Sequence, residues 1–179
     1  MGLDMYLYVG ERHGDVSALD MAEMDSYFWD MEYYRKNPEA YKDCGKPQLD
    51  IEVDKETLDF YENQYNNGGI LREAGYWRKA NHIHNWFVEH VQNGVDDCGV
   101  YPVDEDDLCD LQEVCEFVLE KRNNRTSANF LPTQCGFFFG STDYDEYYYE
   151  DVKDTIDIIN KILDTVDFDK EVVCYQSSW

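Results

Sequence analysis

The segment LDMYLYV, Leu3 to Val9, has the two-residue period of a β-strand and is our starting point for the fold class. Apolar side chains alternate with others along it, which is typical of a strand with one buried face. The chain closes on a second strand-like segment, EVVCYQ, Glu171 to Gln176. Between them CGFFFG, Cys135 to Gly140, is a short apolar run bounded by glycines, which indicates a buried strand. We therefore expect at least three short strands.

The first half of the chain predicts one clear helix and one short one. Ala18 to Arg35 is helical in pattern, rich in aromatic residues, and ends before Pro38. The following segment, 37–69, holds two prolines and the turn NNGG, so we expect irregular structure there with a short helix at 54–65.

Three further helices are predicted by apolar stripes. One begins at Tyr76 and ends at Gly94, one follows Val103, and one follows CGFFFG. The acidic run DEDD falls in the first turn of the second, where the helix dipole favours anions. The stripes are Tyr76, Ala80, Ile83, His84, Phe87, Val88 and Val91, then Leu108, Leu111, Cys115, Val118 and Leu119, then Val152, Ile156, Ile159 and Leu163.

Together these segments predict an α+β fold, with a small, mainly antiparallel sheet and about three helices packed on one face. The length of 179 residues suits one domain with a substantial core, so we treat 1–179 as a single domain.

The net charge restricts the kinds of partner that the protein can bind. Fifteen Lys and Arg against 39 Asp and Glu give a formal charge of −24. Such a surface repels nucleic acid and anionic membranes and attracts basic partners, although it is also typical of a solvated, solubilising face. We expect neither direct nucleic-acid binding nor membrane binding.

The six cysteines are scattered without a C-x-x-C pair, which argues against a zinc ribbon or a thioredoxin-like site. The start MGLDMYLYVG lacks the basic and apolar regions of a signal peptide, and no segment is apolar for long enough to span a membrane. We expect a cytoplasmic protein with reduced thiols, without a metal or other cofactor.

The segment YWRKANHIHNWF holds two histidines one residue apart. On a strand both would face the same way and could share a metal ion, whereas on a helix they lie far apart around the axis. The helical pattern places His84 in the core and His82 on the outer face, so we expect no metal site. His82 shares that face with Arg78, Asn85 and Glu89, at a spacing that fits either a ligand-binding stripe or an exposed intrahelical ion network.

The turn Gly140-Ser141-Thr142 offers further ligand contacts, because free backbone N–H groups at such a turn can hold a phosphate. Against this, Asp143 follows at once, and Thr142 with Asp145 has the spacing of a capping box. If the two segments line one concave site, its residues are Arg78, Lys79, Asn81, His82, Asn85, Ser141 and Thr142.

Two acidic runs form an alternative contact surface. Their carboxylates could engage the Arg and Lys of a nucleic-acid-binding enzyme as phosphates do, or both runs could be solvated helix starts. Their residues are Asp104, Glu105, Asp106, Asp107, Asp143, Asp145, Glu146, Glu150 and Asp151. No Ser or Cys stands beside a His in a catalytic motif, so we assign no catalytic residue and expect a binding protein rather than an enzyme.

Five strings carry a resemblance: MGLDMYLY, GYWRKANHIHNWFV, VQNGVDDC, LPTQCGFFFGSTDYDEYYYEDV and YQSSW. They resemble a family of small, mostly uncharacterised bacteriophage and prophage proteins, from Met1 to Trp179 apart from the stretch before Gly69. The resemblance brings no catalytic residues with it. It implies an accessory role in the cytoplasm of an infected bacterium.

That context leaves three functions open. The first is a counter-defence inhibitor (an anti-CRISPR or anti-restriction protein) that mimics the charge of DNA and binds a host defence protein with a basic surface. The second is a non-catalytic sponge that sequesters a nucleotide signal in an Arg and aromatic pocket, and the third is a hydrolase of a nucleotide-type substrate. The charge favours the first.

Overall fold

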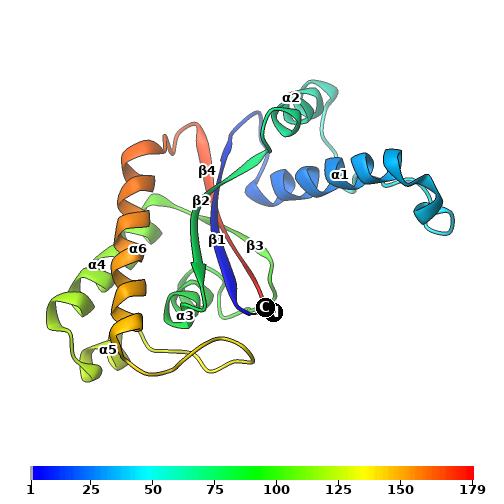
Figure 1. Cartoon of the computed structure of the whole chain (residues 1–179). Helices are drawn as coiled ribbons and strands as arrows, with labels where there is room; N and C mark the ends of the chain where they lie inside the picture. The colour runs from blue at the N-terminus through cyan, green and yellow to red at the C-terminus, as the bar shows by residue number, and fades with distance from the viewer. Residues whose placement is uncertain (1) are drawn as a thin grey trace.

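The computed structural model describes residues 2–179, which form an α+β fold around an antiparallel sheet (Figure 1). Four strands lie in the order β2-β1-β4-β3, and each neighbouring pair is antiparallel. Their bounds are β1 Asp4–Glu11, β2 Leu71–Arg78, β3 Val100–Val103 and β4 Glu171–Ser178. The strands predicted at the two ends of the sequence are confirmed, and they pair with each other in the middle of the sheet.

Six α-helices and one 3-10 helix accompany the sheet within residues 2–179, so the expectation of about three helices was too low. Their bounds are α1 Ala18–Lys36, η1 Pro38–Tyr41, α2 Lys55–Asn66, α3 Asn81–His90, α4 Glu105–Lys121, α5 Asn124–Phe130 and α6 Glu146–Thr165. The predicted helices at 18–35, at 54–65 and after Val103 agree with α1, α2 and α4. None of the described helices has the length and apolar character needed to cross a bilayer.

The helices cover both faces of the sheet, and the expectation of a single covered face was wrong. On one face Leu7 and Tyr175 belong to a core shared with α3, α4 and α6. On the other face Val172 and Cys174 belong to a second core shared with α1 and α2. Because successive residues of a strand point to opposite sides, the continuous apolar run of β4 requires cover on both sides.

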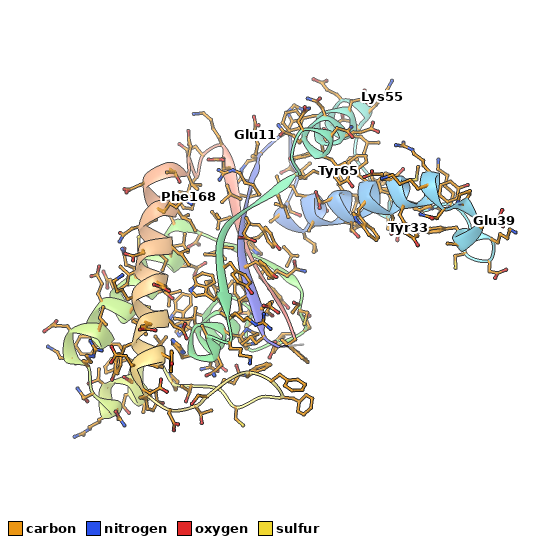
Figure 2. All side chains as sticks on the ribbon, in the orientation of Figure 1. Glu11, Tyr33, Glu39, Lys55, Tyr65 and Phe168 are labelled. Carbon is orange, nitrogen blue, oxygen red and sulfur yellow. The ribbon has the colours of Figure 1, made fainter. Side chains whose placement is uncertain are left out.

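Helix α1 projects well beyond the edge of the sheet (Figure 1). Its first half is anchored by Met21, Met24 and Phe28 in the second core. Its far end and η1 carry Tyr33 and Glu39 out into solvent, away from the sheet (Figure 2). The protein is therefore a two-faced sheet with a protruding helical arm.

The helix predicted from Tyr76 starts five residues too early. Residues Leu71–Arg78 form the edge strand β2, and the helix begins only at Asn81. Only Gly75 and Trp77 of β2 are buried, so the sequence of this strand is largely polar and resembles a surface segment. Lys79, with φ of 64°, makes the tight turn that separates strand from helix.

The strand predicted at CGFFFG is also wrong. Residues 135–140 form an irregular loop, in which Phe138 has a φ of 66° and Gly140 a φ of 101°. Phe137 is 85% exposed, whereas Phe139 is buried in the first core. A short apolar run does not distinguish a buried strand from a loop that inserts one side chain.

One glycine sets how closely α6 packs on the sheet. A Cβ on Gly75 would lie 2.5 Å from Cγ2 of Ile158, so only glycine permits this approach of α6 to β2. This close packing fixes α6 against β2.

Candidate ligand pocket and acidic surface

Segments that are far apart in the sequence meet around the start of α3, at the end of the sheet where the two chain ends lie (Figure 1). The backbone N–H of Lys79 donates to the Leu3 carbonyl at 2.8 Å. The indole Nε1–H of Trp179 donates to Asp96 Oδ1 at 3.0 Å, and its ring lies 6.0 Å from that of Phe139. The five strings quoted from the sequence thus contribute to one region of the structure.

Asn81 joins α3 to the loop that precedes α6. Its Nδ2 donates to the carbonyls of Phe139 at 3.1 Å and Ser141 at 2.8 Å, and its Oδ1 accepts from the N–H of Gln134 at 3.0 Å. The side chain is buried and its polar atoms are engaged, so Asn81 shapes the region instead of offering contacts to a ligand.

His82 lines a cavity of about 360 Å³ between the β2–α3 turn, the segment 140–145 and the start of α6. The expectation that His82 faces solvent was wrong, because the residue is only 2% exposed. Its ring packs on that of Tyr148 with 4.2 Å between centroids. Burial lowers the pKa of His82 to about 3, so its imidazole is neutral.

Side chains of both charges line this cavity, which we call the His82 pocket. Arg78 and Lys79 come from the β2–α3 turn, and Asp143, Asp145 and Asp151 come from the start of α6 and the loop before it. Burial is the main reason that the pKa of Asp151 is raised to about 7. The negative charges of Asp154, Glu150 and Asp145 raise it further. Gly140, Ser141, Tyr147 and Tyr148 complete the lining.

His84 does not line the His82 pocket. Its side chain is buried in the core, as expected, and both of its ring nitrogens have hydrogen-bond partners. Its Nε2 lies 3.2 Å from Asp96 Oδ2 and its Nδ1 lies 2.8 Å from the Tyr175 hydroxyl. Because a carboxylate only accepts, Nε2 carries the proton and donates to Asp96, and Nδ1 accepts from Tyr175. Burial lowers the pKa of His84, and Asp96 opposes this. The network ties α3 to β4 and, through Trp179, to the end of the chain.

Apart from Asn81, the sequence-predicted ligand residues separate into two groups. Arg78, Lys79, His82 and Ser141 do meet in the His82 pocket. Asn85 is half-buried and Thr142 is exposed, and neither lines the pocket. The capping role considered for Thr142 belongs to Asp145, whose Oδ1 accepts from the N–H of Tyr148 at 3.1 Å.

The two acidic runs lie at opposite ends of a pair of antiparallel helices. Gln112 of α4 bonds to Asn160 of α6, and Arg122 at the end of α4 pairs with Glu146 at the start of α6. The run 104–107 therefore lies at one end of the pair and the run 143–151 at the other. Since α6 has 20 residues, the two are separated by about 30 Å along the pair.

Several of these carboxylates are engaged within the protein. Asp104 and Asp107 accept from each other's backbone N–H in a capping box. Glu146 is paired with Arg122 at 2.5 Å, and Asp151 faces the His82 pocket. Glu105, Asp106, Asp143 and Glu150 remain exposed.

Sequence reasoning missed Asp96, Tyr147 and Tyr148, the first as a partner of His84 and the others as pocket walls. Only the proximity of the sequence strings in space reveals these roles, because no local spacing relates Asp96 to His84. Within residues 2–179 no group of three or more His, Cys, Asp and Glu side chains is arranged to hold a metal ion.

Comparison with known proteins gave no match: no family model, curated protein or solved structure is significantly similar to this chain.

Proposed function

We propose that the protein is an acidic inhibitor that binds the basic, nucleic-acid-binding surface of another protein and keeps nucleic acid away from it. The observation that carries this proposal is the outer face of α4. This acidic ridge, free of cations from residue 105 to residue 120, consists of the exposed residues Glu105, Asp106, Asp110, Glu113, Glu116 and Glu120.

The spacing of the ridge suits a partner that binds a phosphate backbone. Residues three and four apart on a helix are neighbours, with about 5–6 Å between Cβ atoms. From Asp106 to Glu120 the ridge extends about 21 Å at the helical rise of about 1.5 Å per residue. Each strand of duplex DNA carries a charge about every 3.4 Å along its axis. A cationic groove that accepts phosphates at such short intervals can also accept these carboxylates.

The charges of the ridge are largely uncompensated by the protein itself. Within residues 2–179 only Glu120 of the ridge has an ion pair, with Lys121 at 2.6 Å. Like charges at these helical spacings destabilise a helix by about 0.2–0.5 kcal/mol per pair. An external cationic surface would relieve this repulsion, which supports a role in binding over a role in folding.

The resemblance to bacteriophage proteins supports a particular class of partner. A protein made in an infected bacterium meets nucleases of the host defence, such as CRISPR nucleases and restriction enzymes. These enzymes have basic nucleic-acid channels to which a ridge of this charge is complementary.

The test is a DNA-binding competition. Purified protein is added to a Cas9-type nuclease and to a type II restriction enzyme, and DNA binding is followed by mobility shift. We expect the protein to displace DNA from at least one of them, more weakly as salt is raised. The triple substitution Asp110→Lys, Glu113→Lys and Glu116→Lys should abolish the effect.

The matched control changes the charge equally at another place. Asp43→Lys, Asp50→Lys and Glu52→Lys alter three exposed carboxylates in the segment between η1 and α2. This variant should inhibit as the unchanged protein does. Equal inhibition by the α4 variant, or no displacement of DNA from either enzyme, would refute the proposal.

A further inference from the structure

The His82 pocket has features that the acidic ridge does not use. It is a cavity of about 360 Å³, within the range of about 300–1,000 Å³ typical of small-molecule sites. It is lined from three separate segments, namely the β2–α3 turn with α3, the loop before α6, and α6 itself. The question is which ligand its side chains would accept.

One of the residues that line the pocket has a buried polar atom without a partner. Nε2 of His82 is buried and makes no hydrogen bond with residues 2–179. Leaving a buried polar group unpaired costs about 1–3 kcal/mol. A bound molecule with a hydrogen-bonding group at this atom would remove this cost, so the pocket is more complete when occupied than when empty.

The walls separate positive from negative side chains. Arg78 and Lys79 lie on the β2–α3 side, and both are exposed. Asp143, Asp145 and Asp151 lie on the α6 side. A simple anion would be attracted by the first wall and repelled by the second. A molecule with an anionic group at one end and N–H or O–H donors at the other would satisfy both.

Tyr147 adds a flat surface at the mouth of the pocket. Its side chain is 76% exposed although it lines the cavity. An aromatic ring held at the rim of a polar pocket offers a stacking face for a planar group.

We propose that the His82 pocket binds a nucleoside monophosphate. Its phosphate meets Arg78 and Lys79, its base stacks on Tyr147, and the donors of its sugar or base meet the carboxylates and His82. The proposal is independent of the acidic ridge, because it uses a different surface and a different class of ligand.

The protonation of Asp151 gives the proposal a pH signature. The charged groups around it are Asp145, Glu150 and Asp154 on its own helix and its cap, Asp143 on the loop, and Arg78 and Lys79 opposite. The titratable group His82, which is neutral, also faces the pocket. With a pKa of about 7, Asp151 gains a proton as the pH falls from about 8 to about 6.5. A protonated Asp151 no longer repels the phosphate held on the opposite wall, so binding should tighten in that direction.

The test is isothermal titration calorimetry of the whole protein with AMP, GMP, CMP and UMP, and with adenosine and inorganic phosphate. We expect at least one monophosphate to bind about tenfold or more tightly than either adenosine or phosphate, because both ends of the ligand contribute. Arg78→Ala should weaken binding by about tenfold or more, since it removes a charged hydrogen bond at an exposed position. Arg125→Ala, an exposed arginine of α5 outside the pocket, is the matched control and should leave binding unchanged.

His82→Phe should remove binding while the protein stays folded, as checked by circular dichroism. Between about pH 8 and about pH 6.5, the affinity of Asp151→Asn should change less than that of the unchanged protein. The proposal is overturned if no monophosphate binds, if phosphate or adenosine binds as tightly as the best monophosphate, or if Arg78→Ala binds normally.

Discussion

The buried, neutral state of His82 predicts a loss of stability in mild acid that the substitution His82→Phe abolishes. The pKa of this histidine is about 3 in the folded protein and 6.5 in the unfolded chain. Above the unfolded value neither state binds the proton, so the folded protein has its full stability. As the pH falls below it, only the unfolded chain takes up the proton, and the folded state loses stability.

The magnitude follows from this difference. At about pH 4.5 the unfolded histidine is protonated and the folded one is not, because its pKa lies well below that pH. Two pH units at about 1.36 kcal/mol each give a loss of about 2.7 kcal/mol relative to neutral pH. The expected loss of unfolding free energy depends on the pKa of His82 in the unfolded chain. The pKa in the folded protein needs only to lie well below about pH 4.5, and its exact value does not change the result.

The assay is urea unfolding followed by tryptophan fluorescence, at about pH 7 and about pH 4.5. We compare the change in unfolding free energy between the two pH values for the unchanged protein, His82→Phe and His90→Gln. Effects of the larger phenyl ring on packing cancel in this comparison. The loss should be smaller by about 2.7 kcal/mol in His82→Phe. His90→Gln, which alters an exposed ring, should behave as the unchanged protein. Equal losses in all three proteins would show that His82 is accessible to protons, and the reasoning would fail.

Three further predictions concern packing, the loop before α6, and pH. Gly75→Ala should lower the unfolding free energy by about 1–3 kcal/mol, because the new methyl group meets Ile158. In thermal melts, Gly75→Ala combined with Ile158→Ala should be less destabilised than the sum of the single changes. Asn81→Ala should lower the unfolding free energy by about 1–3 kcal/mol, because three backbone groups lose their hydrogen-bond partner, and it should speed proteolysis of the loop 134–145. The control Phe137→Ala, at an exposed position of the same loop, should change the unfolding free energy by less than about 0.5 kcal/mol. Asp151→Asn should have a higher unfolding free energy than the unchanged protein at about pH 8, but not below about pH 4. The raised pKa of Asp151 in the folded protein makes the folded state lose stability as the pH rises from about 4 to about 7, and the neutral amide removes this loss.

Strong periodic patterns predicted the central elements correctly. LDMYLYV and EVVCYQ are the two middle strands. Buried residues alternate along most of the first, whereas the second has a continuous buried run because both of its faces are covered. In the predicted stripe of α4, Leu108, Leu111, Cys115 and Val118 are buried and Leu119 is partly buried. These elements could be recognised because burial on one side or both leaves a repeating pattern in the chain itself.

The edges of the fold left no such pattern. β2 and β3 are edge strands, in which exposed positions include the charged residues Arg72, Glu73 and Arg78 and, at Pro102, a residue that cannot donate to a ladder. The loop at CGFFFG was mistaken for a strand because its shape depends on the hydrogen bonds of Asn81, more than fifty residues away. The burial of His82 likewise depends on Tyr148, which reaches it from another helix.

The residue order alone accounts for the α+β class, the antiparallel centre of the sheet, the acidic character and the chemistry available at the site. These properties are local or additive, since they follow from periodicity and from counting charges. Folding in three dimensions brings Arg78, Lys79 and His82 together with Asp143, Asp145 and Asp151 in one pocket, and it separates the two acidic runs along α4 and α6. Those outcomes depend on how helices pack on the sheet, which is set by contacts between distant residues such as Gly75 and Ile158.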